Sequence, residues 1–232
     1  GAEQYRRQYL NRYKDPSLKS DRVFTNTGNY NNLVIFIRFS NQNEFTEPLS
    51  PYATAFNGTG TVSMFEYFQE VSKNQLNIST TFYPNSGGTQ ILSYQDSHSR
   101  RYYQPYSATN AEGYRNDNQY VDREMTLLKN AVESVAAQVI ASGINYDHDQ
   151  DGRIDNVCFI IQGATDGWSD LLWPHRWVLY RYDVRIGDKQ VYDFNFQLSE
   201  ALGVSVLCHE MFHSLGSPDL YRYENDNITP VG

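Results

Sequence analysis

Apolar runs mark the strands expected in this chain. Leu33–Ile37 and Val157–Ile161 are unbroken apolar runs, which predict strands covered on both faces. Apolar residues alternate over Leu76–Phe82, which predicts a half-exposed strand, and Val191–Phe196 predicts one more. Residues 41–60 contain two prolines and two glycines, so we expect a loop there.

Apolar stripes predict one long helix and two shorter ones. The long helix is expected to end at Gly143, and its stripe is Val121, Met125, Leu128, Val132, Val135 and Val139. A capping box at Ser63 and Glu66 begins a short helix whose stripe is Phe65, Phe68 and Val71. The last helix is expected from about Leu202 to Leu215, and its stripe is Val204, Leu207, Met211 and Leu215.

The order strand, helix, helix, strand predicts an α/β (α+β) fold, in which a mixed twisted sheet carries a long backing helix. The chain has 232 residues, which suits one domain. Residues 1–28 are polar and lack periodicity, so we expect a tail or the remnant of an upstream pro-segment. Residues 29–232 are then the folded domain.

The net charge and the hydropathy exclude two classes of partner. A formal charge of −8 argues against binding to nucleic acid or to an anionic membrane. No apolar run approaches the roughly 20 residues that cross a bilayer. The two cysteines, Cys158 and Cys208, each lie within an apolar segment. We therefore expect buried free thiols, and a disulfide between them is the alternative.

The stretch Cys208–Tyr221 reads CHEMFHSLGSPDLY and carries the clearest chemistry in the chain. On the last expected helix, His209 and His213 are four residues apart, so both imidazoles can reach one ion at a Zn–N distance of about 2.0–2.1 Å. Glu210 follows the first ligand directly and can serve as a general base toward water. The pattern predicts a catalytic zinc site.

A third zinc ligand is expected after the helix. Gly216 can take the left-handed conformation that turns the chain back toward the ion. That turn would bring Asp219 to the metal, although an aspartate in a Ser-Pro-Asp turn also has a purely structural interpretation. The rival third ligands are Glu224, Asp226 and His175.

An acidic loop predicts a second metal site. Asp147, Asp149, Asp151 and Asp155 stand at positions 1, 3, 5 and 9 of a calcium-type loop. Gly152 stands at position 6 for the sharp turn, and Arg153 offers its backbone carbonyl at position 7. Position 12 is Cys158 rather than the bidentate glutamate of an EF-hand. We expect a structural Ca²⁺ here rather than a sensor site, and the alternative is a solvated acidic turn.

The zinc motif resembles a known group of enzymes. H-E-x-x-H-x-x-G-x-x-D is similar to the long motif of metzincin-type metalloendopeptidases. Together with "GSPDLY", "WPHRW" and "DHDQDGRIDNV", it resembles the immune inhibitor A family of secreted bacterial zinc peptidases over residues 33–232. This resemblance implies a metzincin-like peptidase domain. No methionine follows Met211, so the Met-containing turn of such domains is missing from this stretch.

The expected function is that of a secreted zinc metalloendopeptidase acting on protein or peptide substrates, with an upstream pro-segment as an intramolecular partner. His175 is a weaker candidate for contact with substrate, and a structural histidine is the alternative. Tyr221 is a weaker candidate for an oxyanion donor. Two rival functions remain: a catalytically inactive, calcium-stabilised binding or adhesion domain, and a zinc hydrolase acting on a non-peptide substrate.

Overall fold

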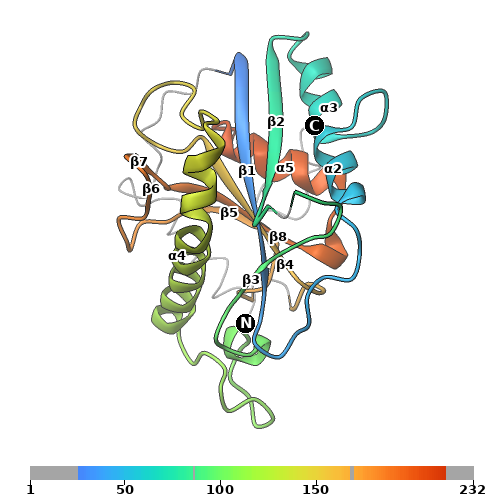
Figure 1. Cartoon of the computed structure of the whole chain (residues 1–232). Helices are drawn as coiled ribbons and strands as arrows, with labels where there is room; N and C mark the ends of the chain where they lie inside the picture. Colours follow the sequence, from blue (N-terminus) through green and yellow to red (C-terminus); the bar gives the residue numbers. More distant parts are fainter. Residues whose placement is uncertain (1–25, 86, 168–169, 218–232) are drawn as a thin grey trace, which may run out of the picture.

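A mainly parallel sheet forms the centre of the molecule (Figure 1). The computed structural model describes residues 26–85, 87–167 and 170–217. The strand order is β2-β1-β4-β8-β5, and β3 pairs with the end of β1. The strands are β1 (Gly28–Arg38), β2 (Leu76–Tyr83), β3 (Tyr94–Gln95), β4 (Asn156–Ile161), β5 (His175–Val178) and β8 (Asp193–Leu198). Within this sheet only β5 runs antiparallel to its neighbour, so the expected mixed α/β architecture is confirmed.

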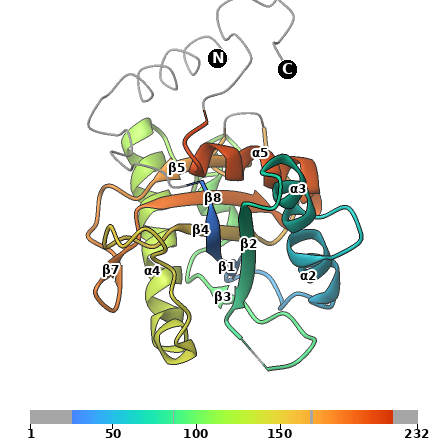
Figure 2. The same cartoon turned by 90° about the horizontal axis from the view of Figure 1, so that it is seen from above.

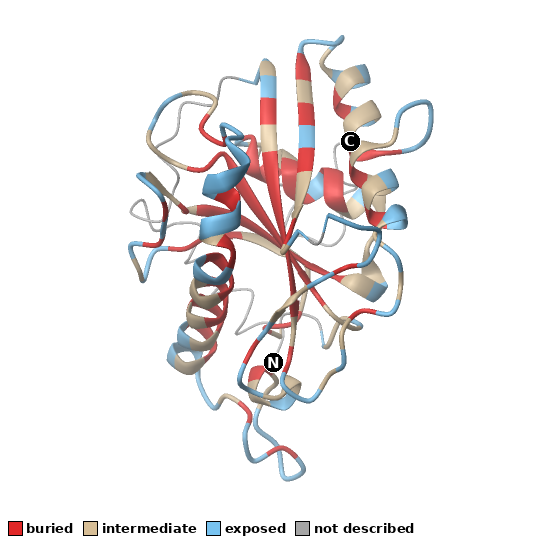
Figure 3. Ribbon diagram, viewed as in Figure 1, coloured by how far each residue is buried: buried red, intermediate tan, exposed pale blue. Residues whose placement is uncertain are grey.

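The two unbroken apolar runs form the interior strands. β1 lies between β2 and β4, and β4 lies between β1 and β8. Every residue of β4 is buried, as are Leu33 to Ile37 of β1. Figure 3 shows this burial concentrated in the middle of the sheet. A strand with helices on both faces needs apolar side chains in both directions, which explains the continuous pattern.

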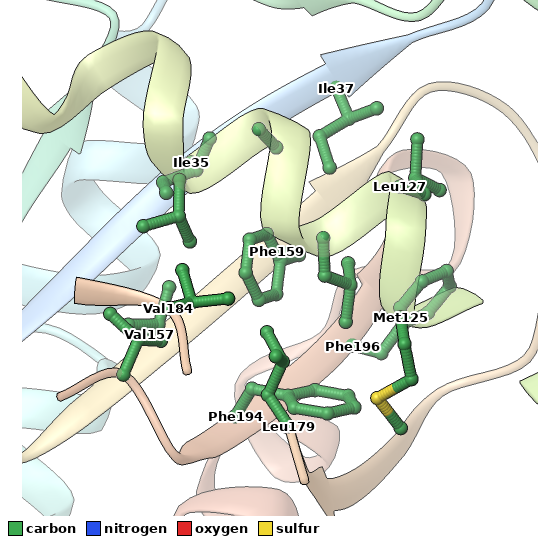
Figure 4. Packing of buried hydrophobic residues seen from close by; sticks show 14 of the residues in the cluster. Ile35, Ile37, Met125, Leu127, Val157, Phe159, Leu179, Val184, Phe194 and Phe196 are labelled. Carbon is green, nitrogen blue, oxygen red and sulfur yellow. The ribbon is translucent and has the colours of Figure 1, made fainter. Parts of the chain in front are cut away.

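The long helix α4 (Asp117–Ser142) covers one face of the sheet, as its stripe predicts. Asn116 caps it by accepting a hydrogen bond from the Gln119 amide at 3.0 Å, and Gly143 ends it. Figure 4 shows Met125 and Leu127 of α4 among the aromatic and aliphatic side chains of the strands. This packing forms one of two hydrophobic clusters in the described residues.

Three helices cover the other face, as Figure 2 shows from above. They are α2 (Ser50–Asn57), α3 (Met64–Val71) and α5 (Val204–Ser214). The cap of α3 is confirmed, because Ser63 Oγ accepts from the Glu66 amide at 3.1 Å. The Glu66 carboxylate instead accepts from the Gly60 amide at 2.8 Å. The expected stripe of α3 was wrong at Val71, which is 49% exposed, and Met64 is buried in its place.

Helix α2 contradicts the loop expected over residues 41–60. Pro51 lies in its first turn, where a backbone N–H has no helical partner to lose, so proline begins this helix instead of breaking it. The smaller elements are η2 (Arg100–Tyr103), β6 (Arg185–Ile186), β7 (Lys189–Gln190) and η3 (Ser199–Ala201). Among the described residues, no helix combines the length and hydropathy needed to cross a membrane.

Candidate metal centre

The helix α5 follows β8 and lies on the face of the sheet opposite α4 (Figure 2). Leu207, Met211 and Leu215 are buried in the cluster that this helix shares with α2 and α3. Cys158 and Cys208 are buried in the same cluster as free thiols, as expected. Burial raises the pKa of Cys208 to about 12, so this thiol stays protonated beside the candidate metal ligands.

The end of α5 is a Schellman turn. The Gly216 amide donates to the His213 carbonyl at 3.0 Å, and the Ser217 amide donates to the Phe212 carbonyl at 2.9 Å. Gly216 has φ +92°, the left-handed conformation expected for it. The helix therefore ends at Ser214, one residue after His213, and the chain leaves the helical path at Gly216.

The two histidines of the motif converge. Nε2 of His209 and Nε2 of His213 lie 3.2 Å apart. Two nitrogens bound to one tetrahedral zinc ion at about 2.0–2.1 Å are separated by roughly 3.3–3.4 Å. The described structure thus brings both side chains to the separation that a shared zinc ion requires.

The Schellman turn also fixes the protonation of His213. Nδ1 of His213 lies 2.8 Å from the Ser217 carbonyl oxygen. A carbonyl can only accept, so Nδ1 carries the proton, and the neutral ring keeps its lone pair on Nε2. This arrangement is common among metal-binding histidines, whose second nitrogen donates to a carbonyl or a carboxylate.

Glu210 lies between the two histidines in sequence but is more deeply placed than the first of them. It is 6% exposed, whereas His209 is exposed. The pKa of Cys158 is raised, first by burial and then by the negative charge of Glu210. That charge also contributes to a raised pKa of His175. Glu210 is therefore a buried carboxylate on the sheet side of the candidate metal centre.

His175 has a hydrogen-bond partner at each of its ring nitrogens. Its Nδ1 donates to the Trp173 carbonyl at 2.6 Å, and its Nε2 lies 2.9 Å from Oε1 of Glu124, which is buried on α4. Burial lowers the pKa of His175, but the Glu124 carboxylate and both hydrogen bonds outweigh this effect, and the pKa is raised. With both nitrogens donating, His175 has no lone pair for a metal.

The remaining candidates near the zinc motif are Asp219, Tyr221, Glu224 and Asp226, and all four lie outside the described residues. The described part of the candidate zinc centre is thus His209, Glu210 and His213, followed by the turn through Gly216 and Ser217.

The acidic loop brings three of its four aspartates together. Carboxylate oxygens of Asp147, Asp149 and Asp151 all lie within 4.8 Å of one another, a spread that suits Ca–O distances of about 2.3–2.6 Å. Gly152 has φ +84°, as the sharp turn at this position requires. The Asp147 carboxylate is buried, and its Oδ1 has no hydrogen-bond partner among the described residues. Such an orphaned anionic oxygen fits a cation ligand.

Asp155 is not part of this convergence. Both of its carboxylate oxygens accept from the His148 amide, at 3.2 and 3.1 Å. The Asp155 side chain therefore closes the loop by binding the backbone of residue 148. Arg153 donates its amide to Asp151 Oδ1 at 2.8 Å, and its guanidinium stacks over the Tyr192 ring. The position-9 prediction therefore does not match the geometry, because the chain directs this carboxylate toward residue 148.

Sequence reasoning missed two residues at these sites. Lys189 Nζ lies 2.9 Å from Asp147 Oδ2 and comes from the β6–β7 hairpin, which is 42 positions away in the chain. Ser217 contributes only a backbone carbonyl. No side-chain pattern signals either contact, although the helix-ending glycine before Ser217 indicates a turn in which carbonyls are available.

No protein-family model matches the chain, and a search of curated proteins finds no match. Any functional assignment therefore depends on the residues described above.

Proposed function

We propose that the protein is a zinc-dependent metalloendopeptidase with a metzincin-like site. His209 and His213 hold the metal through Nε2, and Asp219 completes the ligand set because of its spacing after Gly216. The observation that carries the proposal is the 3.2 Å separation of the two Nε2 atoms. The bond from His213 Nδ1 to the Ser217 carbonyl supports it, because it leaves the Nε2 lone pair directed away from the turn.

A zinc ion held by His209 and His213 would supply Lewis-acid polarisation of a peptide carbonyl and would lower the pKa of a bound water molecule to about 7. Glu210 takes the proton of the attacking water on its carboxylate and later delivers it to the nitrogen of the leaving amine. Because Glu210 is 6% exposed, bulk water competes little for this carboxylate. His213 and the Ser217 carbonyl keep the metal-binding tautomer in place during the reaction.

The resemblance to immune inhibitor A peptidases extends this proposal to location and partners. It makes the protein a secreted enzyme that acts on proteins or peptides. The formal charge of −8 agrees with a substrate that is neither nucleic acid nor an anionic membrane surface.

The proposal also includes a structural calcium ion in the acidic loop. Asp147, Asp149 and Asp151 supply carboxylate oxygens, and the buried Asp147 Oδ1 is the specific observation in favour of an ion. The loop connects α4 to β4, so the ion would stabilise the junction between the backing helix and the sheet. It has no role in the hydrolytic step.

The decisive experiment substitutes the base without touching the ligands. We expect Glu210→Gln to reduce peptide hydrolysis by about 10²–10⁴-fold, the usual contribution of a general base, while the bound zinc measured by elemental analysis stays at the wild-type level. His213→Ala should lose both zinc and activity. Glu200→Gln is the matched control, because it makes the same chemical change at an exposed position just before α5.

Other results would point to the rival functions. A wild-type protein that binds zinc but cleaves neither casein nor gelatin would be an inactive binding domain or a hydrolase of non-peptide bonds. Full peptidase activity in Glu210→Gln would remove this residue from the base role. A folded wild-type protein that binds no zinc would refute the proposal as a whole.

A further inference from the structure

A row of buried polar side chains crosses the sheet face beneath α5. The row, called the amide row below, consists of Thr80 on β2, Asn32 on β1, Asn156 on β4, Asn195 on β8 and Ser214 on α5. Asn156 Nδ2 donates to Asn32 Oδ1 at 2.7 Å, and Asn32 Nδ2 donates to Thr80 Oγ1 at 3.2 Å. All members are buried, so they satisfy one another instead of bonding to bulk water.

Ser214 is the member of the row that belongs to the metal-binding helix. Its Oγ lies 2.9 Å from Asn156 Oδ1 and 3.0 Å from Asn195 Oδ1. Both amide oxygens can only accept, as can the Glu210 carbonyl oxygen at 3.4 Å, so the single hydroxyl proton of Ser214 is shared between the two nearer amide oxygens in a three-centre bond. The side chain directly after His213 is therefore bonded to two neighbouring strands at once.

These bonds differ in kind from the apolar contacts of α5 with the sheet. Leu207, Met211 and Leu215 bury apolar surface, which holds the helix against the sheet but is non-directional. Apolar packing restrains such a helix through the shape of its neighbours alone. The hydrogen bonds of Ser214 have preferred lengths and angles, so they select one rotation of α5 about its axis.

A small rotation matters for a metal site. The Nε2 atom of a helical histidine lies roughly 6 Å from the helix axis, so a turn of about 10° moves it by about 1 Å. Metal–ligand distances tolerate only about 0.2 Å. His209 and His213 would move together and keep their mutual separation. Their alignment with any ligand that lies outside α5 would be lost.

We propose that Ser214 is a positioning residue for the candidate zinc centre: its bonds to Asn156 and Asn195 set the rotation of α5 and thereby the direction in which His209 and His213 present Nε2. This inference rests on the proposed function for its consequence in zinc binding. The effect on the two imidazoles does not depend on zinc.

The test compares two variants of the same helix in the full chain. Ser214→Ala removes the hydroxyl and little volume, whereas Met211→Ala removes apolar contact and leaves the amide row intact. We expect Ser214→Ala to weaken the zinc Kd, measured by competition with a chromophoric chelator, by about 10- to 100-fold, as for other outer-shell partners of metal ligands. Met211→Ala should unfold at lower denaturant and change the zinc Kd by less than about threefold.

Two further measurements complete the test. Asn195→Ala should also weaken zinc binding, and the double variant with Ser214→Ala should be little worse than either single one, because both changes break the same bond. In the zinc-free protein, the imidazole NMR shifts of His209 and His213 should change in Ser214→Ala and stay unchanged in Met211→Ala.

The outcomes separate the two proposals. A wild-type Kd in Ser214→Ala, with unchanged imidazole shifts, would make the amide row purely structural and overturn this inference while the zinc site stands. A wild-type protein without zinc affinity would refute the proposed function, and the imidazole shifts of the zinc-free variants would then decide the role of Ser214.

Discussion

On the α4 side of the sheet, the strands β1, β4 and β8 present apolar side chains throughout, namely Leu33, Ile35, Ile37, Val157, Phe159, Ile161, Phe194, Phe196 and Leu198. On the α5 side, the same strands present five buried polar residues, namely Asn32, Asn156, Asp193, Asn195 and Gln197. The side chains on both faces are buried. The faces differ in whether the buried atoms need hydrogen-bond partners.

This difference indicates which face contributes most of the folding free energy and which one determines the orientation of the helix packed on it. Burying apolar surface contributes roughly 25 cal/mol per Å² without demanding any orientation. A buried amide gains little net free energy and costs about 1–3 kcal/mol if it is left unpaired. Leaving a polar group beneath α5 unpaired therefore costs free energy, and α5 is the helix whose orientation the candidate site depends on.

The largest effect expected on the α4 side comes from the acidic loop that joins α4 to β4. An ion present at a hundred times its Kd stabilises the folded state by about 2.7 kcal/mol. We expect a calcium-selective chelator to lower the melting temperature by several degrees. Mg²⁺ should not restore it, because Mg²⁺ demands near-ideal octahedral geometry.

Substituting two of the converging carboxylates provides the control for calcium. Asp149→Asn with Asp151→Asn should reproduce the effect of the chelator and abolish the response to calcium, while the zinc Kd stays unchanged. Melting that is indifferent to both treatments would identify the loop as a solvated acidic turn. A change in zinc affinity would show that the two sides of the sheet are coupled.

On the α5 side we expect a smaller change in stability, and it is an increase instead of a decrease. Gln197 is 1% exposed, and neither atom of its amide has a hydrogen-bond partner among the described residues. Gln197→Met keeps the length of the side chain and removes the unpaired groups. We expect the free energy of unfolding to rise by about 1–2 kcal/mol in chemical denaturation.

The matched comparison for Gln197 is Asn195→Leu on the same face of the same strand, which breaks the contact with Ser214 and should lower the free energy of unfolding. If Gln197→Met proved destabilising instead, its amide would have a partner in solution, and the α5 side would be more fully paired than the described contacts indicate.

The difference between the two faces also explains which parts of the fold the sequence could predict. Unbroken apolar runs predicted β1 and β4, and the stripe of α4 identified its buried side, because each pattern reports directly on apolar burial. β8 reads DFNFQL, an alternation typical of a half-exposed strand, yet all six residues are buried. Alternation identifies two faces of a strand but does not show whether the polar one meets water or a helix.

The candidate site shows the same limit. The spacing of His209 and His213 predicted that both side chains can reach one ion, because helical geometry is local. The amide row, the Lys189–Asp147 contact and the pairing of His175 with Glu124 join positions 19 to 124 residues apart. Only the sheet order brings these residues together, so no local pattern could reveal them.

The smallest effect concerns a buried polar pair on the α4 side, His175 and Glu124. The pKa of His175 is raised in the folded state, so the pair stabilises the fold fully below the ordinary histidine pKa of about 6.5, and this contribution is lost as the pH rises through the raised value. Glu124→Gln removes the carboxylate charge that raises the pKa. We therefore expect the variant to lose less stability than the wild type between about pH 6 and pH 9, as measured by denaturation at each pH. Glu133→Gln, the same change at an exposed position of α4, should keep the wild-type slope. Equal slopes in all three proteins would mean that His175 does not titrate over this range and that its pairing with Glu124 contributes no pH dependence.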